Sequence, residues 1–584
     1  MEAPRSELFD DVYFSRADGA AETEHVFLDG NNLPEAWQGR PRFTIAETGF
    51  GTGLNFLLAW DLFDRTAPAG AFLDFISIEK YPLTAEQIRR WLEPWKERLA
   101  PSLDKMLEQY PIRVPGFHRM VFDGRVALTL IFGDVNDVLP EITASVDAWF
   151  LDGFTPSKNP AMWTEELFGQ MARLSHAGTS AATFTAAGFV KRGLRAAGFA
   201  VEKRKGFGTK RDMLAGRFAG EGAAPPVSTA PAAPAIGPAM APPITASRTV
   251  HILGGGLAGC SAAYSLKQYG FTPVLYDPGG IAAYASGNPT GLVNPRFSAF
   301  RTAESDFYTA GYAQAIRSFA RFSAIDYARC GGLHLITGEE KEKRLTRTAA
   351  NWGWAVDHMR LVGAAEASSI AGVPLSHPAL YLADAAQVSP QKLCHAYVRD
   401  VEVRRGVYAP VEGDIVLYAN AAAAGSMFDL PVHTVRGQVT MVEANAISRK
   451  LKCNLSYGGY IAACRGGSHA IGATFQKWLE DNLARDEDDE SNLRQLLENV
   501  PALSGPGFRI TGRRASLRTA SKDRFPIIGA LDGEGHYIST AHGSHGLVSS
   551  LAGAHLLADI IRSGPFSLPA STVRALAASR FKRA

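Results

Sequence analysis

Short apolar runs alternate with amphipathic stretches along most of the chain. In the first third, four apolar runs have the length and composition of buried strands: FTIAE, LDFISIE, VALTLIF and VDAWFLD. Residues 85–99, between two of these runs, have the periodicity of an amphipathic helix. The runs RTVHIL and TPVLYD continue the pattern after residue 247. Strands that alternate with helices predict α/β domains with parallel sheets, whose ligands bind at the carboxyl ends of the strands.

One internal segment lacks this pattern. Residues 219–247 are rich in Ala and Pro and contain almost no charged or large apolar side chains, so we expect an extended, semi-rigid linker. The chain has 584 residues, more than the roughly 250–300 that one core supports. We therefore predict a domain at 1–218, a linker at 219–247 and a second domain at 248–584.

Composition limits the classes of function. A net charge of +2 means that any nucleic-acid surface must be a local patch. The five cysteines form no CxxC pair and have no zinc spacing, so we expect no metal and a reducing cytoplasm. The N-terminus has no signal-peptide pattern. Residues 547–561 are apolar but short and contain His555 and Asp559, which predicts a buried helix and no membrane span.

The strand ends of the first domain carry polar and glycine residues in a characteristic order. A glycine loop follows the first strand, an acid ends the second, and another acid follows the third. Glycines let the backbone approach a ligand closely, and a carboxylate at the second strand can accept both ribose hydroxyls. This order matches the class I S-adenosylmethionine-dependent methyltransferases, and the absence of a P-loop Lys-Ser/Thr argues against a nucleoside triphosphate. The predicted S-adenosylmethionine-binding residues are Glu47, Gly49, Gly51, Gly53, Glu79 and Asp134.

Asp152 ends the fourth strand, which lies beside the methyl donor in this fold. A carboxylate there can orient the lone pair of an amine acceptor and stabilise the positive charge that develops. We predict that Asp152 is catalytic; the alternative is that it caps the following turn.

Several long strings resemble the MnmC family of bifunctional enzymes that modify the wobble uridine of tRNA. They are DVYFS, VFLDGNNL, ETGFGTGLNFL, LDGFTPSKNPAMW and FTAAGFVKRGLRAAGF, and they span nearly all of the first 215 residues. The resemblance implies that Asp152 faces the aminomethyl group of the substrate uridine. It also implies that Phe154 and Pro156 shape the pocket.

A basic run, EKRKGFGTKRDM, lies near the end of the first domain. Clustered lysine and arginine attract phosphates irrespective of sequence, and the glycines favour a loop that can follow an irregular RNA surface. A solvated charged face is the alternative. Given the resemblance, we predict contacts to the tRNA backbone from Lys203, Arg204, Lys205, Lys210 and Arg211.

The second domain opens with a dinucleotide fingerprint. The strand RTVHIL leads into Gly254, Gly256 and Gly259 at the start of a helix, and Asp277 ends the next strand. We expect the pyrophosphate at the helix N-terminus and the adenosine ribose at Asp277.

Features far from the fingerprint favour FAD. Ser286 follows the second strand, and a glycine-rich turn precedes a late helix, as in the D-amino-acid oxidase and glycine oxidase superfamily, which this domain resembles. The resemblance implies an antiparallel substrate-binding sheet and flavin contacts from Ser286, Gly543, Gly546 and Leu547. It also implies that Arg518 binds the substrate carboxylate with support from Tyr460, since guanidinium holds both carboxylate oxygens. A structural ion pair and a core tyrosine are the alternatives for these two residues.

Two further features qualify this assignment. The segment between Tyr397 and Asn420 is shorter than the superfamily usually has, near where the adenine end of FAD is covered. His251, His542 and His545 fall near the expected cofactor site, and we predict that they are local hydrogen-bonding groups and not catalytic bases.

The second domain also resembles the MnmC flavin domain over its whole length. The resemblance implies that FAD-dependent oxidation removes the carboxymethyl group of 5-carboxymethylaminomethyl-(2-thio)uridine and that S-adenosylmethionine then methylates the resulting amine. We expect tRNA as partner, no membrane, and a monomer. Three alternatives stay open: both halves act on free small amines, the flavin half only positions tRNA, or it acts on folate.

Overall fold

The computed structural model describes residues 5–6, 8–14, 18–220, 248–504 and 507–581. These residues form two compact units, one of residues up to 220 together with 563–570, the other of residues 248–562 and 571–581. Residues 221–247 of the expected linker lie outside the described part. In the part that is described, no helix combines the length and apolar character needed to cross a membrane.

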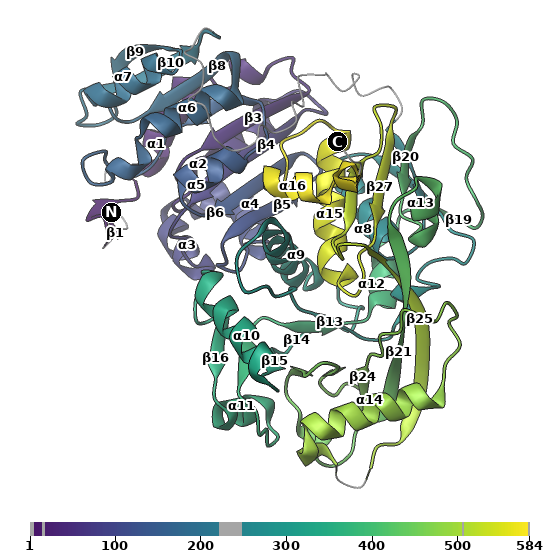
Figure 1. Cartoon of the computed structure of the whole chain (residues 1–584). Coiled ribbons are helices and arrows are strands. Elements are labelled where there is room, and N and C mark those ends of the chain that lie inside the picture. Colours follow the sequence, from purple (N-terminus) through teal and green to yellow (C-terminus); the bar gives the residue numbers. More distant parts are fainter. Residues whose placement is uncertain (1–4, 7, 15–17, 221–247, 505–506, 582–584) are drawn as a thin grey trace. The chain divides into compact units, whose positions relative to one another are not determined.

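The first unit is built on one eight-stranded mixed sheet (Figure 1). Five strands, β6, β4, β3, β7 and β8, run parallel, while β5 and β10 pair antiparallel at the two sides. In sheet order the strands are β5 (Gly116–Phe122), β6 (Val126–Phe132), β4 (Phe72–Glu79), β3 (Arg42–Glu47), β7 (Val146–Phe150), β8 (Ser175–Thr183), β10 (Asp212–Phe218) and β9 (Phe199–Lys205).

The four apolar runs noted in the sequence form β3, β4, β6 and β7. Strand β3 lies between β4 and β7, so the chain changes direction of winding there. Such switch points open a crevice at the carboxyl ends of the strands, where ligands bind in open α/β sheets. The expected helix over residues 85–99 is divided into α3 (Ala85–Leu92) and α4 (Lys96–Glu108) around Pro94, because proline lacks an N–H and disfavours the helical conformation in the residue before it.

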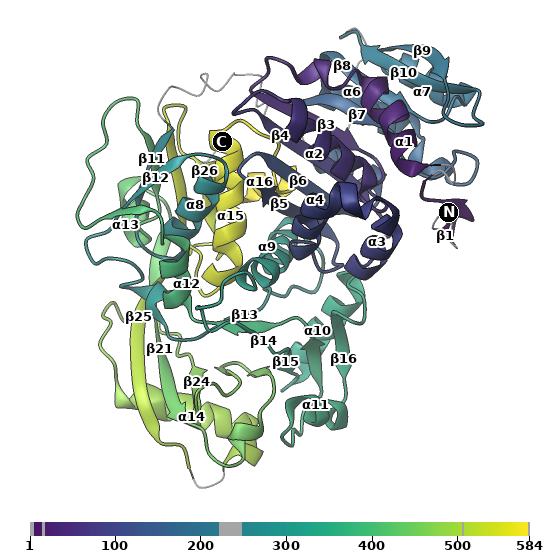
Figure 2. The same ribbon diagram turned by 180° about the vertical axis from the view of Figure 1, so that it is seen from behind.

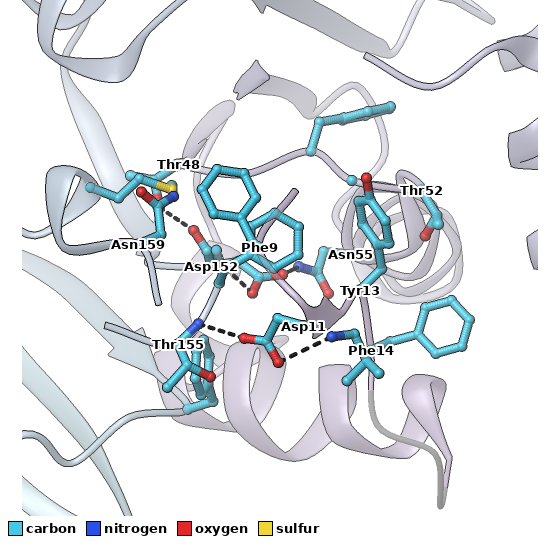
Figure 3. A pocket seen from close by; sticks show the side chains of 18 of the residues that line it. Phe9, Asp11, Tyr13, Phe14, Thr48, Thr52, Asn55, Asp152, Thr155 and Asn159 are labelled. Atoms are coloured by element: carbon cyan, nitrogen blue, oxygen red, sulfur yellow. Dashed lines mark hydrogen bonds between the residues drawn. The ribbon is translucent and has the colours of Figure 1, made fainter. Parts of the chain in front are cut away.

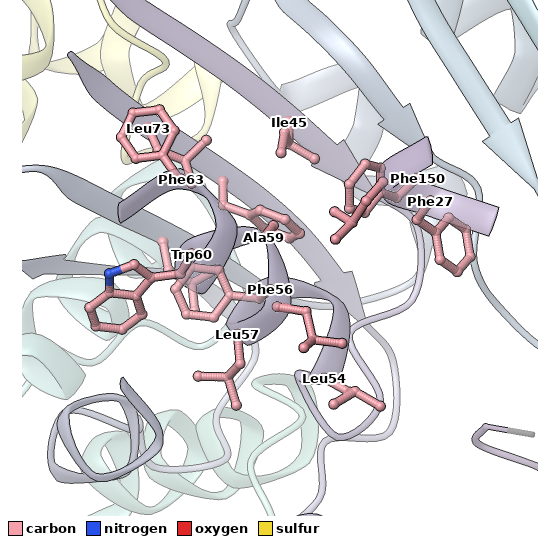
Figure 4. Close-up of a cluster of buried hydrophobic side chains, with 14 of the residues drawn as sticks. Phe27, Ile45, Leu54, Phe56, Leu57, Ala59, Trp60, Phe63, Leu73 and Phe150 are labelled. Atoms are coloured by element: carbon pink, nitrogen blue, oxygen red, sulfur yellow. The ribbon is translucent and has the colours of Figure 1, made fainter. Parts of the chain in front are cut away.

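Helix α2 (Leu54–Thr66) directly follows the glycine loop and packs on one face of the sheet (Figure 4). Phe56, Leu57 and Trp60 are buried against strand residues such as Ile45 and Phe150. Each fully buried side chain of this size contributes about 1.5–3 kcal/mol. The first half of α2 therefore cannot move without exposing its apolar surface, which makes it a rigid support for the loop before it.

The opposite face of the sheet has its own core, formed with α6 (Glu165–Leu174) and α7 (Gly188–Ala196). Alternate strand residues separate the two cores: Ile45 belongs to the first and Ala46 to the second. This alternation accounts for the continuous apolar runs in the sequence, since parallel strands covered on both faces bury every side chain.

The second unit contains a six-stranded sheet in which β11 (Thr249–Leu253) is central and β26 is antiparallel (Figure 2). Its other strands are β19 (Glu402–Arg404), β12 (Thr272–Tyr276), β20 (Ile415–Tyr418), β27 (His536–Thr540) and β26 (Ile527–Ala530). The helix α8 (Leu257–Gln268) packs against α15 (Gly546–Ile561). Helix α15 is the buried helix expected from residues 547–561; α9 (Ala303–Phe319) also packs on it.

The second unit also contains a three-stranded sheet of β13 (Gly291–Val293), β18 (Ala386–Val388) and β14 (Ala328–Arg329), and a mostly antiparallel eight-stranded sheet. Its long strands β21 (Val432–Glu443) and β25 (Ile510–Ser521) pair along most of their length, and α14 (Asp486–Asn499) packs against β21 and β24. The remaining strands of this sheet are β16 (Met359–Val362), β17 (Ala379–Leu382), β15 (Gly332–Leu335), β22 (Asn454–Ser456), β23 (Tyr460–Ile461) and β24 (Ser468–Gly472). The predicted antiparallel sheet is therefore present, and it carries both Arg518 and Tyr460.

Two candidate active sites

A cavity of about 740 Å³ lies at the carboxyl ends of β3, β4, β6 and β7. Its walls come from the glycine loop, from the segments that follow the other three strands, and from residues 9–14 near the N-terminus (Figure 3). Of the predicted residues, Gly49, Gly51, Glu79, Asp134 and Asp152 line it. Four strands thus bring together side chains that are more than a hundred residues apart in sequence.

Glu79 ties the second strand to the glycine loop. Its carboxylate accepts hydrogen bonds from the backbone N–H groups of Gly51 at 2.9 Å and Tyr81 at 2.8 Å. Burial raises the pKa of Glu79 in spite of these bonds. Asp134 instead pairs with Lys80 at 2.7 Å. Burial raises its pKa, but the bonds from Lys80 and Asn136 outweigh that effect and leave the pKa lowered. One acid therefore shapes the loop and the other stays ionised at the cavity edge.

Asn55 connects two buried carboxyl groups. Its amide nitrogen donates to Asp152 Oδ2 at 2.7 Å and to Glu47 Oε1 at 2.8 Å, and its oxygen accepts from the Thr23 hydroxyl at 2.6 Å. Ser77 donates a further bond to Glu47 at 2.6 Å. Asn55 was not predicted from the sequence, although it is the one polar residue among the buried positions of α2, and that contrast was the available signal.

This network changes the acidity of both carboxyl groups. Burial raises the pKa of Asp152 to about 7, against the opposing effects of hydrogen bonds from Gly153 and Asn55. Burial, together with the charge of Asp152, raises the pKa of Glu47 to about 8. Asp152 faces the cavity, whereas Glu47 and Gly53 do not line it. Glu47 therefore supports Asp152 from behind, and Gly53 serves the turn into α2 with its positive φ of 79°.

Asp152 also shows the capping role considered as the alternative. Its Oδ1 accepts from the N–H of Gly153 at 2.8 Å, while Oδ2 is held by Asn55. A single carboxylate therefore both stabilises its turn and presents a fixed oxygen to the cavity.

Aromatic side chains surround the entrance above Asp152. Phe9 stacks on Phe154 at 4.7 Å between ring centroids, and Tyr13 meets Phe154 edge-on at 5.4 Å. The segment that carries them is attached through Asp11, which accepts from the N–H of Thr155 at 2.9 Å. Such an arrangement can receive a flat base. Phe154 was expected from the family resemblance; Phe9 was not predicted.

The basic run is more ordered than the expected loop. Lys203, Arg204 and Lys205 belong to β9, and only the following turn is irregular. Lys203 pairs with Asp212 at 2.8 Å and Lys210 with Glu22 at 2.9 Å. The regular strand forms because residues 199–205 pair with β10 throughout.

Lys210 lies in the wall of the cavity. Its ammonium group sits 4.2 Å from the ring centroid of Phe184. Arg204 pairs with Glu202 on the exposed face of β9, so three of the five predicted backbone contacts have carboxylate partners.

A second cavity, of about 810 Å³, lies in the second unit. Its wall joins segments from both ends of that unit and contains Gly256, Ser286, Tyr460, Arg518, Gly543, Gly546 and Leu547, all of which were predicted. The predicted residues Gly254, Gly259 and Asp277 lie behind this wall.

The three residues behind the wall hold the fingerprint turn. A methyl group at Gly259 would lie 1.9 Å from the carbonyl oxygen of Gly254, so only glycine permits this packing of α8 against β11. The carboxylate of Asp277 accepts from the N–H groups of Gly255 at 2.7 Å and Gly279 at 2.8 Å. At the N-terminus of α8 the N–H of Leu257 donates to the Ser286 hydroxyl at 2.9 Å, and both residues line the cavity. The start of a helix in such a position suits a pyrophosphate.

Arg518 points into this cavity without a counter-ion. Among the residues the structure describes, no carboxylate pairs with Arg518. Burial lowers the pKa of Arg518, although its neighbour Tyr460 acts to raise that pKa and so opposes the effect of burial. Burial raises the pKa of Tyr460 to about 12. A buried cation with free donors is the arrangement that a substrate carboxylate completes.

Of the three predicted histidines, His542 and His545 line the cavity and His251 does not. The ring of His251 contacts the Tyr276 hydroxyl at 3.2 Å, and the ring of His545 packs edge-on against Tyr308. His542 lies between the hydroxyls of Ser539 at 3.0 Å and Ser549 at 2.8 Å. Burial lowers the pKa of His542 and of His545 to about 4. The short segment after Tyr397 forms the edge strand β19, whose Arg404 carbonyl accepts from the N–H of Asp277 at 3.1 Å.

The described residues contain no group of three or more His, Cys, Asp or Glu side chains placed to hold a metal ion.

Comparisons with known proteins agree with this division. Residues 97–219 match the family of S-adenosyl-L-methionine-dependent methyltransferases, and residues 249–560 match the FAD dependent oxidoreductases. Glycine oxidase from Geobacillus kaustophilus has a similar fold, with a TM-score of 0.50 and 19% identity over 57% of this chain and 99% of that one. The first unit is thus a methyltransferase domain, and the second is an FAD-dependent oxidoreductase domain.

Relatives that match the whole chain carry both domains. A protein from Ectopseudomonas mendocina is 37% identical and one from Chromobacterium violaceum is 38% identical, each over 99% of this chain and 96% of the relative. Both are named tRNA 5-methylaminomethyl-2-thiouridine biosynthesis bifunctional protein MnmC. With two cavities of the matching kinds and this similarity over its length, the chain belongs to the MnmC family of bifunctional proteins.

Proposed function

We propose that this chain carries out two successive reactions on the wobble uridine of tRNA. The FAD-dependent domain converts 5-carboxymethylaminomethyl-(2-thio)uridine to the 5-aminomethyl form, and the methyltransferase domain converts that amine to 5-methylaminomethyl-(2-thio)uridine. The observation that carries the proposal is the pairing, on one chain, of a cavity with an uncompensated arginine and a cavity that ends on a buried carboxylate. The first suits a substrate with a carboxylate, and the second suits the amine that remains.

In the oxidoreductase domain, Arg518 would hold the carboxylate of the carboxymethyl group. Because Tyr460 lines the same wall, its hydroxyl can support the orientation of that carboxylate. When bound, FAD would supply the chemistry that oxidises the carbon–nitrogen single bond between the amine and the carboxymethyl carbon to an imine. Water can then hydrolyse that imine and leave the 5-aminomethyl group. Neutral His542 and His545 add no positive charge to the site, and Arg518 is the cation whose charge acts on Tyr460.

In the methyltransferase domain, Asp152 would receive the aminomethyl group. Its Oδ2 is held in place by Asn55, and its ionised form orients the nitrogen lone pair toward the methyl donor and stabilises the developing ammonium. Gly49, Gly51, Glu79 and Asp134 would hold S-adenosylmethionine, while Gly53 keeps the turn into α2 and Glu47 acts through Asn55.

The wider partners follow from the same proposal. Phosphates of the tRNA would meet the basic surface of β9 and its turn, where Lys205 and Arg211 lie beside the paired cations. We further propose that the protein works as a monomer in the cytoplasm, since its five cysteines are free thiols and a reducing compartment keeps thiols in that state.

The decisive experiment is nucleoside mass spectrometry. Transfer RNA that carries 5-carboxymethylaminomethyluridine is incubated with the purified full-length protein, with and without S-adenosylmethionine. The 5-aminomethyl nucleoside should accumulate without the methyl donor and convert to the methylaminomethyl form with it. If neither nucleoside changes, the tRNA function is wrong.

A further inference from the structure

The loop between β24 and α14 presents two exposed aromatic side chains. Phe475 is 54% exposed and Trp478 is 74% exposed, with Lys477 between them. Single exposed apolar side chains are normal on protein surfaces, and Tyr284 and Phe300 are other examples in this chain. Two large rings on one short loop are more informative, because neighbouring apolar groups can form a binding patch. We call residues 475–478 the aromatic loop.

The aromatic loop is held firmly in place by buried groups. Gln476 exchanges both backbone hydrogen bonds with Arg436 at 2.9 Å. Its side chain accepts from the buried guanidinium of Arg436 at 2.5 Å and donates to Asp488 at 2.9 Å. Because Gln476 is fixed inward, its neighbours Phe475 and Lys477 are directed outward. The backbone beside Phe475 therefore has a defined position, so that part of the loop needs little ordering on binding.

This position is next to the substrate-carboxylate site. A methyl group at Gly437 would lie 2.7 Å from Arg518 Nη1 and also 2.7 Å from the carbonyl oxygen of Thr474. The guanidinium and the start of the aromatic loop thus approach the same point of β21. Phe475 itself lines the cavity that contains Arg518, so its ring is available to a larger substrate whose carboxylate is bound there.

Cations stand around the same cavity. Arg344 and Arg524 line it and are exposed, and in the described part of the chain neither has a carboxylate partner. Unpaired bases stack on aromatic rings while arginines contact the backbone phosphates, which is how proteins hold single-stranded RNA. A small free amine would need neither feature.

We propose that the aromatic loop is an RNA-binding platform of the oxidoreductase domain, on which unpaired bases next to the modified uridine stack while Arg344 and Arg524 contact phosphates. The proposal rests on the proposed function, since it requires that the amine be part of an RNA. It adds that the domain recognises the single-stranded nucleotides around the modified base.

The test uses the full-length protein with Trp478→Ala and Phe475→Ala, and with Phe475→Tyr as the variant that retains a ring. Binding is measured with an anticodon stem–loop RNA that has a fluorescent purine beside the modified uridine, and conversion is followed by mass spectrometry. Stacking of one base predicts that each alanine variant weakens binding and raises KM about 5- to 100-fold. Phe475→Tyr should stay close to the unaltered protein.

Matched controls separate this effect from general damage. Leu361→Ala removes an exposed apolar side chain, 41% exposed, from strand β16 and should leave RNA binding unchanged. Arg344→Ala should reduce the salt dependence of binding by about one phosphate contact.

The possible results distinguish the two proposals. If the unaltered protein converts the nucleoside but both alanine variants retain its KM and its fluorescence change, the platform is wrong while the function stands. If the unaltered protein does not convert the nucleoside, the function itself is wrong, whatever the binding data show.

Discussion

In the proposed function, the methyl-transfer chemistry depends on the carboxyl group of Asp152, whose pKa burial raises to about 7. Below that pH the carboxyl group is protonated and cannot stabilise the positive charge that develops on the amine. Above that pH it is ionised and can do so. We therefore expect the methylation rate to rise with pH through about 7 and then level off. Asp152→Asn should lower kcat for methylation about 10²–10⁴-fold and remove this rise from the pH–rate profile. An inflection caused by titration of the substrate amine should persist. A variant that keeps the full rate and the same pH profile would contradict the role.

Arg518 has the corresponding place in the proposed reaction of the oxidoreductase domain. Removing one partner of a buried charge pair costs about 2 kcal/mol or more, so Arg518→Ala should lower kcat/KM at least about 30-fold. Arg518→Lys should recover only part of this loss, because lysine restores the positive charge but cannot hold both carboxylate oxygens. The absorbance of bound flavin is the control. It should not change in these variants, since Arg518 is expected to contact the substrate and not the flavin. Unchanged kcat/KM in the alanine variant would favour a domain that only positions tRNA.

At the scale of elements, the packing of α8 on β11 decides whether the cofactor turn exists. A side chain at Gly259 would overlap the backbone of Gly254, so Gly259→Ala must push the helix outward. We expect a loss of about 1–3 kcal/mol in stability of the second unit and loss of bound flavin, measured by thermal unfolding and absorbance. Gly338→Ala, where no heavy atom lies within 4 Å of the added carbon, is the neutral control. Equal behaviour of the two variants would disprove this account.

At the scale of the whole molecule, the two units have separate sheets, cores and cavities. We therefore expect that the activities can be separated by mutation. Asp152→Asn should accumulate the 5-aminomethyl nucleoside in the presence of S-adenosylmethionine. Arg518→Ala should leave the carboxymethyl form unreacted and still methylate tRNA that is supplied with the aminomethyl group. Nucleoside mass spectrometry checks both, and loss of both activities in either variant would mean that the units depend on each other.

Several features could be predicted because they are local in sequence. The strands β3, β4 and β6, the glycine turns after β3 and β11, and the buried helix α15 each depend on a contiguous pattern. The glycine turn around residue 259 and the carboxylate at the end of β4 can be identified from the local strand–turn–helix pattern without knowledge of the strand order in the sheet. For that reason most of the predicted residues line the two cavities.

Other features depend on contacts between distant segments. Asn55 and Asp152 are 97 positions apart, and no local pattern states that one amide serves two carboxyl groups. The pairing of Lys210 with Glu22 and the presence of Phe475 and Arg518 in one cavity wall depend in the same way on which strands are neighbours.

The sequence by itself determined the two α/β domains and the residue types at their strand ends, because backbone geometry and apolar periodicity are encoded within a few turns of chain. The choice of FAD as the second cofactor came from the resemblance of the second domain to a known superfamily. Only the tertiary structure decided which carboxyl group is held by Asn55, which cations retain free donors and which aromatic rings face solvent. These properties are set by burial and by neighbours across the sheet, and both exist only once the strands have assembled.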